Sequence, residues 1–295
     1  MKTLLFAIIV LLPSSFSIAY ASDVLVNTDW LKTNIDNPEL VIIDMSDETQ
    51  YQRFHIQHAI QLPYRILNQK LKNGVSISIG SDNIVKLLGL LGITANSHVV
   101  VYDDTGGLHA SRLLWELERI NHPKVSLLDG GLVKWILEGN PVTATSFQPK
   151  SKTHYPSPKS FNTKTTATIK DVLPASRAKD TLLIDVRSKE EYIGDVKQRR
   201  SGHIPGAKLW SWDNAINFQD QFKFKTSKKL IAELSSIGLS KKNQSVILYC
   251  RSAHRASQSY VTLRTLGFTK VKIYDGSMNE YGITANAPLT KGLKP

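Results

Sequence analysis

The chain has 295 residues, a length that accommodates two domains of ordinary size. Its composition, 41% hydrophobic and 21% charged, is typical of a soluble globular protein and excludes a disordered or fibrous chain. The net charge of +12 comes from scattered basic residues without a recognisable nucleic-acid-binding module, so we expect no nucleic-acid partner and a basic surface that attracts small anions.

The first 21 residues have the pattern of a secretory signal. A basic start at Lys2 precedes the unbroken apolar run Leu4 to Leu12, and Ala19-Tyr20-Ala21 matches the small-x-small form of a signal-peptidase site. The run is shorter than the roughly 20 apolar residues that a membrane-spanning helix needs, and Pro13 ends it. We therefore predict that residues 1–21 are removed on export to a periplasm, with secretion as the alternative, and that the mature form is not in a membrane.

The remaining sequence repeats one plan twice. Three short β-branched runs in the first half have counterparts in the second: Leu40 to Ile43 with Leu182 to Ile184, Val99 to Tyr102 with Val246 to Tyr249, and Val125 to Leu128 with Val271 to Tyr274. So long a period indicates duplicated domains. Residues 146–164, which combine prolines with Ser, Thr and Lys and lack apolar periodicity, have a linker composition. We predict an N-terminal domain at 22–145, a linker at 146–164 and a C-terminal domain at 165–295.

Within each half, strand patterns alternate with helical ones. Helices are predicted from Ala110 to Ile120 and from Ala256 to Leu266, the second ended by Gly267 as a C-cap. Such alternation predicts an α/β fold, with two similar domains that each contain a mostly parallel sheet flanked by helices. We expect a cleft between them.

The only cysteine, Cys250, lies at a position suited to chemistry. It follows the predicted strand Ser245 to Tyr249 and precedes the helix predicted from Ala256, so it lies where open α/β sheets bind ligands. The helix N-terminus and the neighbouring Arg251 and Arg255 favour a thiolate. Lone cysteines are inert in many proteins, but this neighbourhood indicates a nucleophile. The histidines and the cysteine show no metal-ligand spacing, so we expect no metal and no other cofactor.

Each half also contains a series of further motifs. The second half has Asp185-Val-Arg187, Glu191-Tyr192, Gly202-His203-Ile-Pro-Gly206-Ala207 and the Cys250 loop, and the first half has Tyr102-Asp103, Ala110-Ser-Arg112 and Asp129-Gly130-Gly131 through Trp135 to Pro141. Together they resemble a tandem-domain rhodanese, of the thiosulfate sulfurtransferase family, over nearly all of the chain after the signal.

The resemblance implies covalent sulfur transfer. Cys250 would take the outer sulfur of thiosulfate as a persulfide and pass it to a thiol or cyanide acceptor. Asp103 stands where a second cysteine would be, so the resemblance implies that the N-terminal domain is catalytically silent. It also implies a substrate-binding loop made of Arg251, Ser252, Ala253, His254 and Arg255.

Three alternatives stay open. A cysteine phosphatase of the same fold would have a longer loop than the four residues that separate Cys250 from Arg255. A 3-mercaptopyruvate sulfurtransferase tends to have Gly after the cysteine, so Arg251 favours thiosulfate, although Ser252 and Ala253 replace the Lys and Gly of many members. A persulfide carrier without turnover would keep the same cysteine.

Other marked residues are predicted to be structural. His203 is expected to hold a turn, and Asp185 and Arg187 to brace the loop as an ion pair. Leu108 and His109, in the N-terminal counterpart of the loop, are expected to pack, with a place in the cleft as the alternative. Packing roles are also predicted for Trp210, Trp212 and Phe218.

Overall fold

The computed structural model describes residues 24–149, 152–158, 160–176 and 180–295. The predicted signal at 1–21 lies outside these residues. Within the described parts, no helix is both long and apolar enough to cross a membrane.

The N-terminal domain is built on a five-stranded parallel sheet in the order β1-β8-β7-β2-β4. These strands are β1 (Leu25–Val26), β2 (Leu40–Asp44), β4 (Ile60–Gln61), β7 (His98–Tyr102) and β8 (Val125–Leu128). The α-helices are α1 (Thr28–Asn34), α2 (Glu48–Arg53), α3 (Ser81–Leu90), α4 (Ala110–Arg119) and α5 (Gly131–Leu137). Smaller elements are β3 (His55–Ile56), η1 (Tyr64–Leu67), β5 (Asn68–Lys70), β6 (Ser76–Ser78) and β9 (Val142–Thr143).

The C-terminal domain repeats this topology with a parallel sheet in the order β10-β16-β15-β11-β12. Its strands are β10 (Thr166–Ala167), β11 (Thr181–Asp185), β12 (Lys208–Leu209), β15 (Ser245–Tyr249) and β16 (Val271–Tyr274). Its α-helices are α6 (Ile169–Ala175), α7 (Lys189–Ile193), α8 (Ser227–Ser236), α9 (His254–Thr265) and α10 (Ser277–Tyr281). Smaller elements are η2 (Thr163–Thr165), η3 (Trp212–Ala215), β13 (Ile216–Asn217) and β14 (Lys223–Phe224).

Alternation along the strands gives each sheet two buried faces. In the N-terminal domain, Ile42 and Val100 pack with Leu31 of α1 on one face, while their neighbours along the strands pack on the other with α3 and α4. The predicted α/β fold with two similar domains is therefore confirmed.

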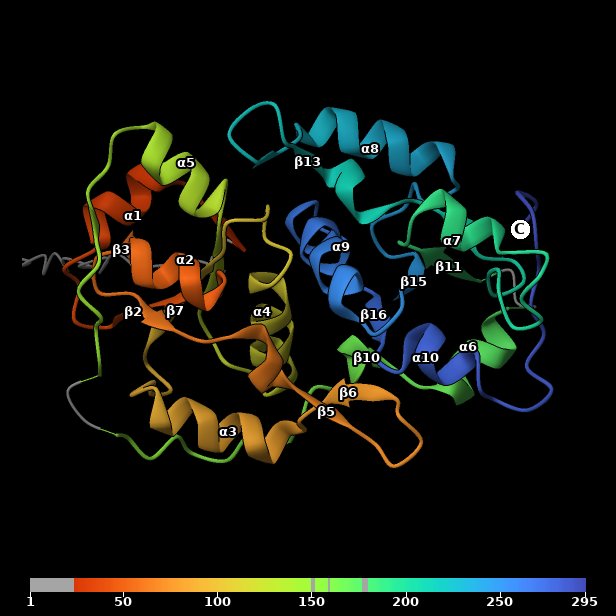
Figure 1. The fold of residues 1–295 in the computed structure, drawn as a ribbon, viewed down its shortest axis with the longest axis horizontal. Coiled ribbons are helices and arrows are strands. Elements are labelled where there is room, and N and C mark those ends of the chain that lie inside the picture. The colour runs from red at the N-terminus through yellow and green to blue at the C-terminus, as the bar shows by residue number, and fades with distance from the viewer. Residues whose placement is uncertain (1–23, 150–151, 159, 177–179) are drawn as a thin grey trace, which may run out of the picture.

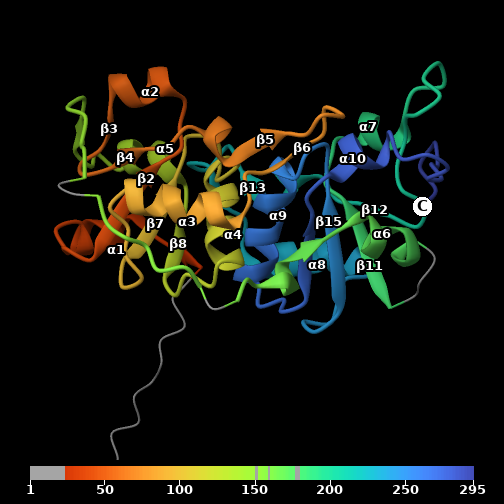
Figure 2. The ribbon, with the colours of Figure 1, turned by 90° about the horizontal axis from the view of Figure 1, so that it is seen from below.

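Helices α4 and α9 pack against each other between the two domains (Figures 1 and 2). A single cluster of buried apolar side chains includes Leu113 and Leu117 of α4 and Tyr260 and Leu263 of α9. A core that is continuous across the interface places the two domains in a defined arrangement. The carboxyl end of β15 can therefore be approached by side chains of the other domain.

The second predicted helix begins earlier than expected. α9 starts at His254, and the residue before it, Ala253, has a left-handed backbone with φ of 63°. Because Ala253 turns the chain into the helix, His254 and Arg255 belong to its first turn rather than to a loop. Gly267 follows the helix with φ of 83°, as predicted for a C-cap.

Candidate active site

Cys250 lies directly after β15, and the residue is only 1% exposed. Its N–H donates to Ser277 Oγ at 3.2 Å, and its carbonyl oxygen accepts from Met278 N at 3.1 Å. The backbone of the cysteine is thus anchored to the start of α10. The thiol itself has no hydrogen-bond partner among the residues that the structure describes.

The loop after Cys250 and the first turn of α9 present a row of backbone N–H groups. Ala253 N–H donates to Ser277 Oγ at 3.1 Å, so it is not available to a substrate. For five other N–H groups the described residues offer no hydrogen-bond acceptor: those of Arg251, Ser252, His254, Arg255 and Ala256. Unpaired amides beside a helix N-terminus form a cradle for an anion or for a negatively charged sulfur.

Arg255 is held by Glu191 of α7. Its guanidinium donates to both carboxylate oxygens, Nη1 to Oε2 at 2.5 Å and Nη2 to Oε1 at 2.9 Å. Burial alone would raise the pKa of Glu191, but the hydrogen bonds and the charge of Arg255, together with the Ser188 N–H and the charge of Arg187, outweigh it, and the pKa is lowered. Glu191 also belongs to a capping box with Ser188, which fixes it at the start of α7. Arg255 is therefore neutralised and oriented before any ligand arrives.

Arg251 differs from Arg255 in its surroundings. It is exposed, and it forms no ion pair with any residue that the structure describes. Its carbonyl oxygen accepts from Asn279 N at 3.0 Å, so its backbone is fixed while its side chain is not. Of the two loop arginines, Arg251 has the charge that is free to attract an anionic donor.

His254 contacts two side chains of the N-terminal domain, those of His109 and Tyr64. Its Nε2 lies 3.0 Å from Nδ1 of His109, and its ring stacks on Tyr64 with 3.9 Å between the ring centroids. Burial, assisted by His109, lowers the pKa of His254 to about 3, so its imidazole is neutral near pH 7. Burial also raises the pKa of Tyr64 to about 12, which keeps its hydroxyl protonated. The expectation that His109 merely packs is wrong, because it contacts a residue of the active loop.

Two motifs of the C-terminal domain make buried structural contacts. Arg187 Nη2 pairs with Asp185 Oδ2 at 2.6 Å and donates to the Gly202 carbonyl at 2.8 Å, which is the ion pair predicted from the sequence. His203 is fully buried, and both of its ring nitrogens lie within hydrogen-bond distance of backbone carbonyls, those of Tyr192 and Lys294. These contacts give His203 the structural role that was expected.

In the N-terminal domain, the backbone N–H groups of the corresponding loop donate to a carboxylate of the protein itself. Asp103 follows β7 as Cys250 follows β15, and it is 1% exposed. Its Oδ1 accepts from the N–H groups of Thr105 and Gly107, and its Oδ2 accepts from those of His109 and Ala110, at 2.7 to 2.9 Å. A resident negative charge on four amides leaves no room there for an external anion.

The three aromatic residues that were predicted to pack differ in their exposure. Trp210 is buried, Trp212 is half-buried against the core, and Phe218 is exposed but has edge contacts with Trp212 and Phe222. Among the described residues, no group of three or more His, Cys, Asp or Glu side chains could hold a metal ion.

Sequence reasoning missed the partners that surround the loop. Glu191 was noted only as part of a motif, and Tyr64 and Ser277 were not singled out. Glu191 did give a signal, since Ser188 three residues earlier completes a capping box. No local pattern marks Tyr64, because its contact with His254 depends on how the domains dock.

Comparison with known proteins identifies related chains. The model of the rhodanese-like domain matches twice, at residues 27–138 and 168–284. A Mycobacterium bovis protein provisionally named thiosulfate sulfurtransferase 1 is 34% identical over 282 residues, 92% of this chain and 98% of that protein. The sulfur carrier protein TtuD of Thermus thermophilus is 30% identical over 283 residues, 92% of this chain and 97% of that protein.

A solved structure shows the same arrangement of two domains. SseA of Escherichia coli, described as a 3-mercaptopyruvate sulfotransferase with the rhodanese fold, superposes with a TM-score of 0.77 at 27% identity. The superposition covers 87% of this chain and 99% of SseA. The similarity therefore extends over both domains.

Proposed function

Because this chain belongs to the rhodanese family and is a rhodanese-type sulfurtransferase, we propose that it transfers sulfane sulfur from thiosulfate to a thiol or cyanide through a persulfide on Cys250. One arrangement supports this most directly. The sole thiol of the chain stands at the start of the segment with unpaired amides, in which Arg255 is paired with Glu191 and Arg251 forms no ion pair with a described residue. Such a site suits a sulfur atom that becomes negatively charged during the reaction.

In the first half-reaction, the Cys250 thiolate attacks the outer sulfur of thiosulfate. A bond forms between Sγ and that sulfur, the S–S bond of thiosulfate breaks, and its electron pair leaves with sulfite. Arg251 attracts the dianionic donor and stabilises the departing sulfite. The free amides hold the terminal sulfur of the persulfide.

In the second half-reaction, the acceptor removes that sulfur. Cyanide attacks the terminal sulfur, a C–S bond forms, and thiocyanate departs while the electron pair of the broken S–S bond returns to Sγ. A thiol acceptor would be converted to a persulfide in the same way. Ser252, half-buried in the loop, is a hydrogen-bond donor for either anion.

Two relatives suggest other donors or no turnover. The likeness to SseA makes 3-mercaptopyruvate the second candidate donor, and the likeness to TtuD makes a carrier without turnover the second candidate role. A carrier would load one sulfur and release it only to a protein partner. A cysteine phosphatase is the third candidate function, and hydrolysis of an aryl phosphate would support it.

We predict that thiosulfate is the better donor and that salt weakens its use. The exposed charge of Arg251 attracts a dianion more strongly than it attracts the monoanionic 3-mercaptopyruvate, and added salt screens exposed charges. Steady-state kcat/KM with cyanide as acceptor, compared for the two donors at two ionic strengths, tests this. A higher kcat/KM for 3-mercaptopyruvate would overturn the choice of donor, and loading without turnover would indicate a carrier.

We also propose that the chain is exported to a periplasm. The basis is the apolar run from Leu4 to Leu12 and the Ala19-Tyr20-Ala21 pattern, both in the sequence. N-terminal sequencing of protein expressed with its natural start is expected to read Ser22-Asp23-Val24. Recovery of the chain from the cytoplasm with Met1 retained would contradict the proposal.

A further inference from the structure

Ser277 adopts a backbone conformation that serine rarely accepts. It follows the Asp275-Gly276 pair after β16, and its φ is 47°, in the left-handed region. The corresponding residue of the N-terminal domain is Gly131, which follows Asp129-Gly130 after β8 and has φ of 51°. Glycine adopts this conformation without penalty, whereas a residue with a side chain is strained. The C-terminal domain has a side chain where its counterpart has none.

The hydroxyl of Ser277 joins the two ends of the active loop. It donates to the Tyr274 carbonyl at 2.7 Å and accepts from the N–H groups of Cys250 and Ala253 at 3.2 and 3.1 Å. The residue is fully buried, so no solvent replaces these bonds. Through Ala253, the hydroxyl also holds the left-handed turn that lies between the free amides of Arg251 and Ser252 and those of His254, Arg255 and Ala256.

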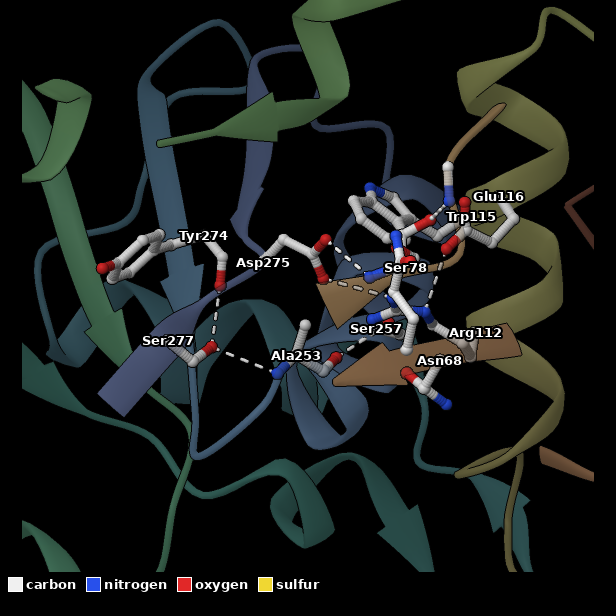
Figure 3. A network of polar contacts seen from close by, with 12 residues as sticks. Asn68, Ser78, Arg112, Trp115, Glu116, Ala253, Ser257, Tyr274, Asp275 and Ser277 are labelled. Atoms are coloured by element: carbon white, nitrogen blue, oxygen red, sulfur yellow. Dashed lines mark hydrogen bonds and ion pairs between the residues drawn. The ribbon is translucent and has the colours of Figure 1, made fainter. Parts of the chain in front are cut away.

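The turn that carries Ser277 is held by the other domain. Asp275 accepts from Arg112 Nη2 of α4 at 3.2 Å through Oδ1, and from the N–H of Ser78 in β6 at 2.9 Å through Oδ2 (Figure 3). Arg112 is fully buried, and its Nε also donates to Glu116 at 3.1 Å. Asp275 is thus fixed from the N-terminal domain, two residues before the hydroxyl that holds the loop.

In the N-terminal domain, the corresponding aspartate, Asp129, makes only one of the two matching contacts. Asp129 accepts from the N–H of Phe224 in β14 at 2.8 Å, which mirrors the bond between Asp275 and Ser78. The residue of α9 that corresponds to Arg112 is Gln258, and its amide atoms have no hydrogen-bond partner among the described residues. The ion pair between Arg112 and Asp275 therefore has no counterpart at Gln258 and Asp129 among the described residues. It occurs beside the turn that carries Ser277, where rigidity of the loop would affect chemistry.

We propose that Ser277 is a positioning residue for Cys250, and that Arg112 of the N-terminal domain holds it in place through Asp275. The proposal rests on the proposed role of Cys250 as the sulfur-accepting nucleophile. The proposal gives the N-terminal domain a function in the reaction. Its buried Arg112 would hold the unpaired N–H groups of the C-terminal domain in position relative to the thiol of Cys250.

Two substitutions at Ser277 separate the hydroxyl from the strained backbone. Ser277→Gly removes the hydroxyl and relieves the strain, while Ser277→Ala removes the hydroxyl and keeps the strain. In both variants we expect the single-turnover rate of persulfide formation to fall by about 10-fold or more, because a small displacement of a reacting group has effects of this size. The KM for thiosulfate should change little, since Arg251 is unaffected. A parental rate in Ser277→Gly would overturn the proposal, because the hydroxyl would then have no part in the reaction.

The path through Asp275 is tested by a double-mutant cycle. Arg112→Gln and Asp275→Asn should each slow persulfide formation, and the double variant should be little slower than Asp275→Asn alone, because both act through one contact. Arg119→Gln is the matched control: Arg119 contacts Glu116 and Ser78 Oγ but not Asp275. It is expected to lower the melting temperature and to leave the loading rate within about two-fold of the parent. Additive effects, or an equally slow Arg119→Gln, would show general loosening of the interface and overturn the proposal.

Inorganic tetrasulfide, used as a second donor, keeps this test separate from the proposed function. The thiolate attacks a terminal sulfur and displaces a trisulfide, so the persulfide forms without thiosulfate. A parent that loads from tetrasulfide but not from thiosulfate would refute the proposed donor while the cycle is still measured. A parent that loads from neither would refute the proposed function and the positioning role with it.

Discussion

Replacement of Cys250 by serine is expected to abolish sulfur transfer, with a loss in kcat of at least about 10³-fold, as for other removed nucleophiles. After incubation with thiosulfate, the parent should gain one sulfur atom, about 32 Da by intact mass, because one thiolate accepts one sulfur. The variant should gain none, because a serine hydroxyl at this position forms no persulfide. Intact-mass spectrometry before and after addition of cyanide measures both loading and discharge.

The control for this prediction is the fold of the variant. Cys250 is buried and its backbone bonds to Ser277 and Met278 do not involve the thiol, so serine should preserve the loop. Circular dichroism and the melting temperature should therefore remain close to those of the parent. A well-folded Cys250→Ser protein that still gains the mass of sulfur would place the acceptor elsewhere and end the proposal.

The second large effect is expected at Arg255, and it should differ from that at Arg251. Arg255 makes two hydrogen bonds to Glu191, a geometry that lysine cannot reproduce. Arg255→Lys should therefore lower kcat/KM by about 10- to 100-fold, because the first turn of α9 and its amides lose their orientation. Arg251→Lys should retain most activity, since its exposed side chain acts through charge. Arg251→Ala should raise the KM for thiosulfate more than it lowers kcat.

Glu191→Gln provides a sharper test of the same pair. Glutamine at this position can still complete the capping box with Ser188, so α7 should keep its start. The variant loses the charge that orients Arg255 and should resemble Arg255→Lys. If Arg255→Lys matches the parent while Arg251→Lys is inactive, the two roles are reversed, although Cys250 as nucleophile would be unaffected.

Much of the fold could be predicted because its signals are local. Short β-branched runs mark the central strands of both sheets, and Gly267 marks the end of α9. The same local reading places Cys250 after β15 and Asp103 after β7, since the residue that follows a strand is a matter of chain order. The start of α9 was predicted two residues late because Ala253, not a glycine or a polar cap, makes the left-handed turn.

The sequence by itself therefore determined the duplicated α/β plan, the position of the single thiol and the absence of a thiol in the corresponding loop of the N-terminal domain. Only the tertiary structure decided which charges around that thiol are free. Arg251 and Arg255 look alike in the sequence, but Glu191, 64 positions away from Arg255, neutralises only one of them. Arg112 and Asp275 are 163 positions apart and meet because α4 and α9 pack together. Such contacts depend on how separately formed elements dock, and local patterns in the sequence do not predict that docking.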